Sequence, residues 1–451
     1  MQKITTTGNA TIIAYDNAPI LATDPWIGDE DSAYFGSWIL SQKIPPDLKK
    51  DIINCKYLWF SHGHPDHLNS ISLERFKESK ILLPDHVGAR IFNDLTNLGF
   101  SVDILPDRKW VELSKNIKIQ CITTYIQDAV LLIDICGKLF INLNDAGTRS
   151  CGGYVRKICE SYANSFLLSL TGYGDADMIN FYDENNIFIK PFAASKPPVG
   201  QQLNYLAKTT GAKSVIPFSS FHQYQRLDSI WAQEYATPID AYEIGLDKKI
   251  NFIKPFCTID CNNLYVEHYK AEELTVDPKA PELFGDNYSD LLGSDDLIKI
   301  KEYFNRKEKV INYFNFLNFH VGGKDNIISM NKNSKKGITF SVPRNSLMIA
   351  IEYRIFDDLL IGNFMKTTLH NCQSLYEGDG NFNFNVTKYS DNGLAETSLE
   401  IRQYLNIYKK RAGAELIMDL FKDKASDLLV RFLTRDSTVF RQIQSFYLSM
   451  K

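Results

Sequence analysis

The feature that most constrains this chain is a cluster of metal-ligand side chains directly after an apolar, aromatic-rich segment at residues 57–60. The cluster has the pattern H-x-H-x-D-H and consists of His62, His64, Asp66 and His67. A strand or a helix, with periods of about 2.0 and 3.6 residues, would scatter these side chains over different faces. They therefore need a loop that folds back on itself, and the glycine and proline inside the motif permit such a turn.

The spacing of these side chains indicates a site for two metal ions. His62 and His64 can face one ion, while Asp66 and His67 face a second ion about 3.5–4 Å away, as in two-metal catalysts. Histidine is scarce in this chain, with 8 in 451 residues, and polar turns prefer Asn, Gly and Ser. A polar turn with fortuitous histidines is therefore the weaker interpretation.

The motif at a strand end resembles the signature of the metallo-β-lactamase superfamily. Residues 21–28 are similar to the strand end with Thr-Asp-Pro-Trp in one branch of that superfamily. Residues 38–40 and 44–46, with their spacing to His62, are similar to the hydrolase-like domain of the CMP-N-acetylneuraminate hydroxylase family. This similarity is specific in about the first third of the chain; it continues through residues 127–145 and more faintly in residues 276–278 and 360–362. That family carries a Rieske iron–sulphur domain, whose C-x-H and C-x-x-H pairs have no counterpart in this sequence. The resemblance therefore implies a chain without a built-in electron donor.

The resemblance also implies further site residues. Asp145 ends an apolar segment and matches the carboxylate that bridges both ions in the superfamily, and His222 follows a strand end where the last histidine belongs. The alternatives are an aspartate that starts a turn and a histidine at the rim or in contact with substrate. Asp24 is expected to hold the N–H of a ligand histidine, or else to be a plain surface residue.

One expected ligand is missing. Most superfamily members have a histidine between the motif and the bridging aspartate, but residues 122–128 contain none. Asp128 could substitute for it or could bind the backbone. The first site would then be His62, His64 and Asp145, a set used by oxygen-activating non-haem iron centres and by zinc hydrolases. The second site would share that aspartate and add the other ligands, Asp66, His67 and His222.

Apolar runs that alternate with turn signals and short helical patterns predict an α/β fold class with two mixed sheets and helices outside. The resemblance specifies a metallo-β-lactamase-like αββα sandwich, which we assign to residues 1–265 as a metal-binding domain. Residues 266–451 are expected to form an additional α+β C-terminal domain or a lid of unknown role. A polar, acidic stretch at residues 277–296 is predicted to connect the two.

Composition excludes several classes of protein. Hydrophobic residues make up 44% and charged residues 23% of the chain, which excludes a disordered chain, and the net charge of −4 argues against nucleic-acid binding. The sequence has no 18-residue apolar run and no apolar leader, so we expect a cytoplasmic protein that does not bind membranes. The eight scattered cysteines are expected to be free thiols.

The sequence favours a dinuclear metal-dependent hydrolase of a small polar metabolite, such as a phosphoester, lactone or amide. Two divalent ions (Zn or Fe, with Mn as a further candidate) would activate water, and Asp66 would orient that water or accept its proton. The alternative is a non-haem diiron oxygenase that acts on a polar metabolite such as a nucleotide sugar and needs an external electron donor. A third interpretation, a scaffold that only binds a ligand, conflicts with the intact motif. The sequence does not determine the oligomeric state, and a homo-oligomer is one alternative.

Overall fold

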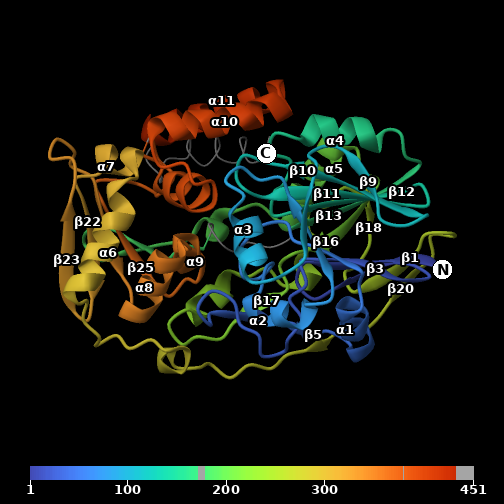
Figure 1. The fold of residues 1–451 in the computed structure, drawn as a ribbon, viewed down its shortest axis with the longest axis horizontal. Helices are drawn as coiled ribbons and strands as arrows, with labels where there is room; N and C mark the ends of the chain where they lie inside the picture. The colour runs from blue at the N-terminus through green and yellow to red at the C-terminus, as the bar shows by residue number, and fades with distance from the viewer. Residues whose placement is uncertain (171–177, 379, 433–451) are drawn as a thin grey trace.

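The computed structural model describes residues 1–170, 178–378 and 380–432 of the chain. Two large sheets lie against each other in the N-terminal part, and a third sheet forms the opposite end of the molecule (Figure 1). Two small antiparallel pairs accompany them: β4 (Trp38–Leu40) with β17 (His222–Tyr224), and β5 (Gln42–Lys43) with β21 (Glu272–Glu273).

The first large sheet is antiparallel at one side and parallel at the other. Its strands, in spatial order, are β20 (Val266–His268), β19 (Cys257–Asp260), β1 (Gln2–Thr7), β2 (Thr11–Asp16), β3 (Ala18–Thr23), β6 (Tyr57–Trp59), β7 (Lys80–Pro84) and β8 (Val102–Leu105). The run from β3 to β8 is parallel. The carboxyl ends of these strands therefore meet at one edge of the sheet.

The second large sheet has the same mixed character. Its strands, in spatial order, are β18 (Asn251–Phe252), β16 (Ser214–Phe218), β13 (Asn164–Leu170), β12 (Lys138–Asn144), β11 (Ala129–Ile135), β10 (Ile117–Thr123) and β9 (Trp110–Glu112). β11 is buried along its whole length. An unbroken apolar run of this kind is typical of a strand covered on both faces.

The two sheets pack through alternating side chains. Ile12 of the first sheet faces inward and joins a core with Phe140 of the second, whereas Ile13 faces outward toward helices. The outer helices are α1 (Pro46–Ile53), α2 (Ser70–Leu73) and α3 (Arg90–Asn97) on the first sheet, and α4 (Gly152–Cys159) and α5 (Val199–Thr210) on the second. The predicted α/β class and αββα sandwich are confirmed.

The third sheet has a separate, phenylalanine-rich core. Its strands, in spatial order, are β15 (Phe188–Ile189), β14 (Phe181–Tyr182), β25 (Lys366–His370), β24 (Gly337–Ser341), β22 (Phe316–Val321) and β23 (Lys324–Ser329). The elements beside it are α6 (Ser294–Asn305), α7 (Glu308–Tyr313), α8 (Arg344–Tyr353), α9 (Phe356–Ile361) and the π-helix η7 (Phe384–Asn392). β14 and β15 belong to this third sheet although they precede residue 265 in the chain. The domain boundary at residue 265 stays a prediction.

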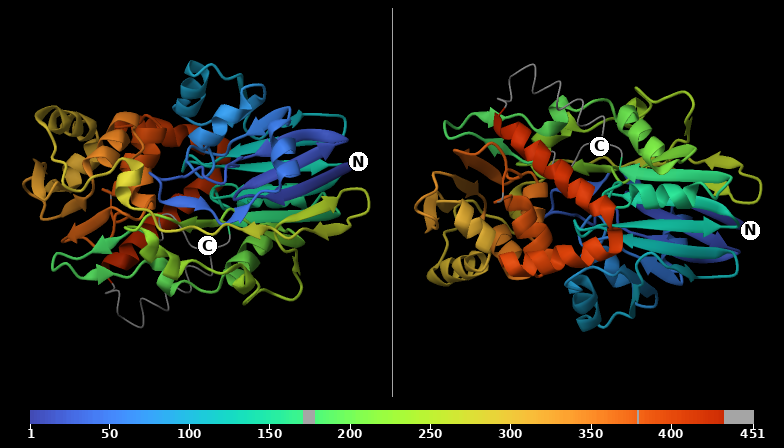
Figure 2. Two further views of the ribbon diagram at one scale, coloured as in Figure 1. Left: turned by 90° about the horizontal axis from the view of Figure 1, so that it is seen from below. Right: turned by 90° about the horizontal axis from the view of Figure 1, so that it is seen from above.

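The last two helices lie between the C-terminal region and the near end of the N-terminal sandwich, as the right view of Figure 2 shows. They are α10 (Ser398–Ala412) and α11 (Ala414–Phe432). The hydroxyl of Tyr404 donates to the backbone oxygen of Tyr125 at 2.6 Å, and Glu415 accepts from the backbone N–H groups of Gly153 and Tyr154 at the start of α4. These contacts join the C-terminal helices to loops near the edge where the strands end.

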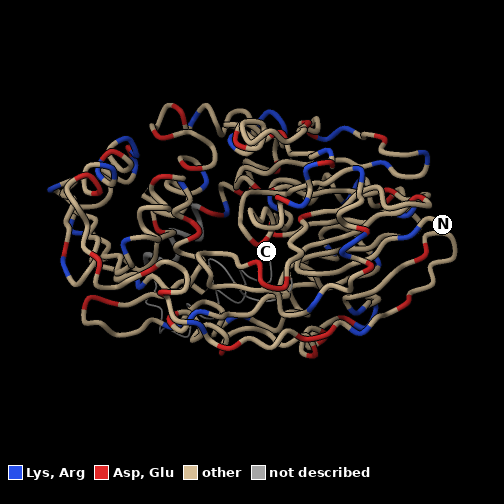
Figure 3. Tube along the Cα trace, turned by 60° about the horizontal axis from the view of Figure 1, so that its bottom comes forward, with Lys and Arg blue, Asp and Glu red and all other residues tan. Residues whose placement is uncertain are grey.

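Charged residues of both signs are dispersed along the trace (Figure 3). Within residues 1–170, 178–378 and 380–432, no helix combines the length and the apolar character that a membrane span requires.

Candidate metal centre

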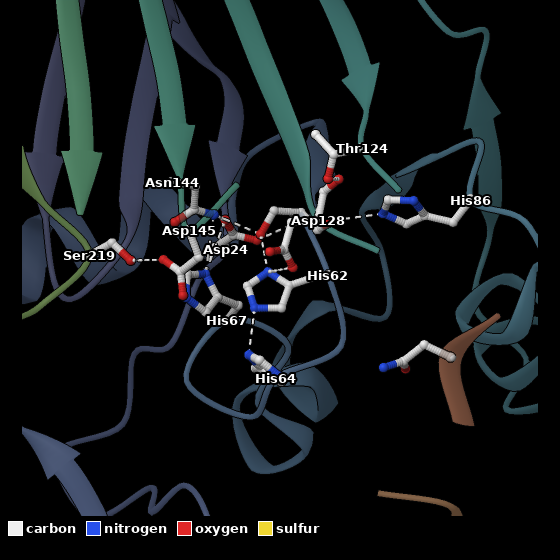
Figure 4. Close-up of polar contacts among 12 residues, drawn as sticks. Asp24, His62, His64, His67, His86, Thr124, Asp128, Asn144, Asp145 and Ser219 are labelled. Atoms are coloured by element: carbon white, nitrogen blue, oxygen red, sulfur yellow. Dashed lines mark hydrogen bonds and ion pairs between the residues drawn. The ribbon is translucent and has the colours of Figure 1, made fainter. Parts of the chain in front are cut away.

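The side chains of the H-x-H-x-D-H motif lie in the loop after β6, at the edge where strands of both large sheets end (Figure 4). Asp24 directly follows β3, and Asp145 directly follows β12. Residues that are far apart in the sequence converge there because their strands end at the same edge.

Three of the predicted ligands form one compact group. One potential ligand atom from each of His62, His64 and Asp145 lies within 4.8 Å of the others. Nε2 of His62 and Nδ1 of His64 face each other at 2.9 Å. Two imidazoles and one carboxylate in this arrangement fit the first of the two ions that the sequence predicts.

A second group lies beside the first and shares Asp145 with it. Nε2 of His67 is buried without a hydrogen-bond partner, 3.3 Å from Oδ2 of Asp66 and 3.4 Å from Oδ2 of Asp145. Burial alone would lower the pKa of His67, but the two carboxylates raise it well above its usual value. Because an unpartnered buried polar atom is costly, this nitrogen and the two carboxylate oxygens fit a divalent cation held among them.

His222 lies on β17 and stacks on the ring of Trp38, with ring centroids 3.5 Å apart. Burial lowers the pKa of His222 to about 4, although Asp66 and Asp145 act in the opposite direction. Its Nδ1 atom is buried without a hydrogen-bond partner. The ring is therefore neutral at pH 7, and its charged neighbours are Asp66 and Asp145 of the second group. His222 is not part of the compact first group.

Asp24 is fully buried and contacts residues of the motif loop and of β12. Its Oδ1 accepts from the backbone N–H of Ser61 at 2.7 Å, its Oδ2 accepts from the amide of Asn144 at 2.6 Å, and Oδ2 lies 3.4 Å from Nδ1 of His67. This position lets Asp24 fix the orientation of the His67 ring, with Nε2 turned toward the carboxylates.

Asp128 lies on the other side of His62. Its Oδ1 is buried without a hydrogen-bond partner and lies 3.8 Å from Nδ1 of His62, to which Oγ of Ser61 is hydrogen-bonded at 2.9 Å. Figure 4 shows Asp128 and His64 on opposite sides of the His62 ring. Asp128 is thus placed to orient His62 rather than to share an ion with its Nε2 atom.

Asp66 is held by two donors that sequence analysis did not identify. The hydroxyl of Tyr34 donates to Oδ1 at 2.6 Å, and the amide of Asn9 donates to Oδ2 at 3.0 Å. Although burial opposes it, neighbouring His67 keeps the pKa of Asp66 below its usual value. An ionised carboxylate held in this way suits a ligand or an orienting group, and proton acceptance by Asp66 stays a prediction.

Several residues around the motif have strained backbone. Non-glycine residues rarely adopt positive φ, and such residues gather at functional sites. Four of them lie at the strand ends described above: Asp24 (φ 40°), Gln127 (φ 67°), Asn144 (φ 49°) and Ser219 (φ 61°). The hydroxyl of Ser219 donates to Oδ1 of Asp145 at 2.6 Å, so this strain accompanies a direct contact with a predicted ligand.

A pocket opens beside His62 and His64, between the N-terminal sandwich and the C-terminal region. The sandwich contributes His86 and Asp128 to its wall, and the π-helix η7 contributes Lys388 and Asn392. The C-terminal residues of the site, including Asp357, could not be predicted from the sequence because no local pattern marks them. The candidate centre therefore lies where two regions of the chain meet.

His86 lines this pocket but is occupied elsewhere. Its Nε2 is hydrogen-bonded to the backbone oxygen of Ser61 at 3.2 Å, and its Nδ1 to the hydroxyl of Tyr408 at 3.4 Å. Burial lowers the pKa of His86 to about 4. It is therefore a neutral structural residue that connects the motif loop to α10.

The depressed pKa of His86 predicts a pH-dependent stability. Below the unfolded-state pKa of about 6.5, His86 binds a proton more readily in the unfolded chain than in the folded chain. The stability that the neutral His86 side chain contributes is therefore present at pH 7 and is lost as the pH falls toward 4. We expect His86→Gln to reduce the difference in unfolding free energy between pH 7 and pH 4.5 by about 2 kcal/mol. Urea unfolding of the metal-free protein at both pH values measures this, and parallel pH profiles for both proteins would contradict it.

Comparisons with known proteins confirm the resemblance to the CMP-N-acetylneuraminate hydroxylase family that the sequence analysis described. A protein of Mycobacterium tuberculosis named as a Rieske 2Fe-2S iron-sulfur protein is 32% identical over 103 residues, which cover 22% of this chain and 19% of that protein. Cytidine monophosphate-N-acetylneuraminic acid hydroxylase of Asterias rubens is 28% identical over 143 residues, which cover 30% of this chain and 21% of the enzyme. The chain thus matches about a fifth of the length of these relatives.

Among solved structures, a metallo hydrolase from Ignicoccus hospitalis aligns with 60% of this chain and 99% of its own, at a TM-score of 0.36 and 16% identity. No family model matches the sequence.

Proposed function

We propose that this chain is a dinuclear metalloenzyme. The observation that carries the proposal is Asp145, which belongs to both ligand groups and can join two ions. The donor set comprises four imidazoles and two carboxylates, listed as His62, His64, His67, His222, Asp66 and Asp145. Imidazole and carboxylate are suitable ligands for divalent zinc, iron or manganese.

The chain's own residues hold this donor set in position. Asp24 orients His67, Asp128 faces His62, and Trp38 fixes the ring plane of His222 by stacking. Tyr34 supports Asp66 through its hydroxyl group. Such outer contacts fix ring orientation and tautomer, which prepares the ligand atoms before an ion binds.

The reaction that we favour is oxygen-dependent hydroxylation of a polar metabolite. Two features support it, and the second, a hydroxylase among the sequence relatives, distinguishes it from the hydrolysis that the sequence alone favours. The first ligand group has two imidazoles and one carboxylate, the set of oxygen-activating iron centres. His86, which also lines the pocket, does not add a third imidazole to this group because its Nε2 is hydrogen-bonded to the backbone oxygen of Ser61. The sequence relatives named above include a hydroxylase. When bound, two iron ions would supply oxygen activation.

Hydroxylation has an electron requirement. One oxygen atom enters a C–H bond and the other becomes water, which consumes two electrons and two protons besides the substrate. Residues 1–451 contain no ligand pairs of a Rieske cluster, so we propose that an electron donor outside these residues supplies the electrons.

Metal-dependent hydrolysis is the second candidate. It is favoured by the same ligand group, since two imidazoles and one carboxylate also bind zinc and leave a position for water. In that case the bound metal would lower the pKa of this water. Asp66, which two donors hold, would orient the water beside the second group.

Metal identity and oxygen consumption separate the two candidates. The protein is purified anaerobically, loaded with ferrous iron or zinc, reduced, and exposed to a measured pulse of oxygen. Hydroxylase chemistry predicts two iron ions per chain and oxygen uptake by the iron form only. Two tightly bound zinc ions, no oxygen uptake by the iron form, and zinc-dependent cleavage of bis(p-nitrophenyl) phosphate would instead establish hydrolysis.

A further inference from the structure

The C-terminal region contributes a carboxylate to the candidate metal centre. Asp357 lies on the short helix α9, and its Oδ2 accepts from Nε2 of His64 at 2.9 Å and from Nζ of Lys388 at 3.2 Å. The Asp357 side chain is only 9% exposed. A buried carboxylate from a distant part of the chain thus contacts one of the predicted ligands directly.

This contact determines which nitrogen of His64 is available to an ion. A carboxylate oxygen accepts hydrogen bonds, so the hydrogen atom of a neutral His64 ring must lie on Nε2. The lone pair is then on Nδ1, which faces Nε2 of His62 at 2.9 Å. The tautomer that pairs with Asp357 is therefore the one that presents Nδ1 to the first ligand group.

The position of α9 relative to the motif is fixed from both ends. At its start, Arg90 of α3 donates to the backbone oxygen of Arg354 at 2.8 Å. At its end, the hydroxyl of Ser37 donates to the backbone oxygen of Gly362 at 2.7 Å. These contacts hold Asp357 against the motif loop, so the hydrogen bond to His64 depends on the docking of the C-terminal region.

Lys388 limits the charge that Asp357 brings. Burial would favour protonation of Asp357, but the Lys388 ammonium and the hydrogen bond from His64 keep the pKa of its carboxyl below the usual value. Asp358, the next residue, has no such partner, and burial raises its pKa to about 7. Asp357 accepts the hydrogen bond from Nε2 of His64 at 2.9 Å, so Asp357 is the one of the two adjacent acids that is placed to hold this ligand.

We propose that Asp357 is a positioning residue of the metal centre: it sets the tautomer and orientation of His64 and makes metal binding depend on the docked C-terminal region. The inference rests on the metal site of the proposed function and does not depend on which reaction the site performs. Outer contacts of this kind typically change metal affinity by about 10–100-fold.

The test measures cobalt(II) affinity of the full chain by competition with a chromophoric chelator. We expect Asp357→Ala to bind the His64-side ion about 10–100-fold more weakly than wild type. Asp357→Asn should be intermediate, because its amide oxygen still accepts from His64 but carries no charge. Asp358→Asn is the matched control, with expected affinity within about threefold of wild type.

The His64 tautomer gives a readout that a loss of stability would not move. In metal-free protein labelled with ¹⁵N-histidine, NMR should show His64 protonated at Nε2 in wild type and a mixture of tautomers in Asp357→Ala. Thermal unfolding of each variant checks that the chain is folded.

Three results would overturn the inference. Equal cobalt affinity of wild type and Asp357→Ala would rule out the positioning role of Asp357, while the proposed metal site would still stand. An equal loss in Asp358→Asn would mean that buried negative charge matters and the hydrogen bond does not. If the wild type binds no divalent metal, the inference fails together with the proposed function.

Discussion

Replacing Asp145 by alanine is expected to remove both metal ions from the protein. The carboxylate belongs to both ligand groups, so its loss takes one donor from each ion at once. We expect metal affinity to fall by more than about 100-fold, the upper range for mutation of a supporting residue alone. Elemental analysis after gel filtration, together with isothermal titration of the metal-free protein, measures this effect.

Two further variants sharpen the Asp145 result. Asp103→Ala removes an exposed aspartate on β8, which pairs with Lys80, and should keep the full metal content. Ser219→Ala removes the hydroxyl that holds Oδ1 of Asp145 and should weaken binding by about tenfold. If Asp145→Ala retained two ions per chain, the shared carboxylate would lie elsewhere and the ligand assignment would be wrong.

Asp286→Ala is expected to lower the free energy of unfolding by about 3–5 kcal/mol. Asp286 and Arg226 form an ion pair at 2.8 Å, and neither side chain is exposed. The same carboxylate accepts from the backbone N–H and the hydroxyl of Ser346 at 3.0 and 2.6 Å. Its removal takes the acceptor from the N–H and hydroxyl of Ser346 and takes one of two carboxylates from Arg226, which also pairs with Asp228 at 2.8 Å. Urea unfolding followed by circular dichroism measures the loss.

The control for this prediction is Asp290→Ala, an exposed aspartate in the same connecting segment. Its unfolding free energy should stay within about 0.5 kcal/mol of wild type. A loss below about 1 kcal/mol in Asp286→Ala would show that the buried pair does not stabilise the contact between the two regions.

The local part of the site could be predicted from the sequence because the motif contains its own geometry. His62, His64, Asp66 and His67 are neighbours in the chain, and a single loop brings them together. Asp145 and His222 required the resemblance to a family, since many aspartates and histidines follow strand ends. Asp357 lies 293 residues from His64. No periodicity or spacing connects residues that meet only through tertiary packing.

For the fold as well, features set by neighbouring residues could be predicted from the sequence, whereas contacts between distant segments could not. Apolar alternation indicates strands and helices, and the resemblance supplies their αββα order. The pairing of β14 with β25 could not be predicted, because a two-residue strand gives almost no periodic signal. Its register depends on the sheet that receives it.

The missing histidine remains the most informative departure of this chain from the superfamily pattern that it resembles. Asp128 lies near the place where the sequence analysis put a substitute, but it faces Nδ1 of His62 and not the nitrogen that faces His64. The first ion would therefore have fewer protein ligands and more open positions, which oxygen or water could occupy.

The central claim is that two ions share Asp145, and anomalous X-ray diffraction from crystals of the metal-loaded protein tests it most directly. We expect two anomalous peaks about 3.5–4 Å apart. One peak should lie beside Nε2 of His62 and Nδ1 of His64, and the other beside Nε2 of His67, with Asp145 between them. No peak at these side chains, or a single peak that Asp145 does not contact, would contradict the account.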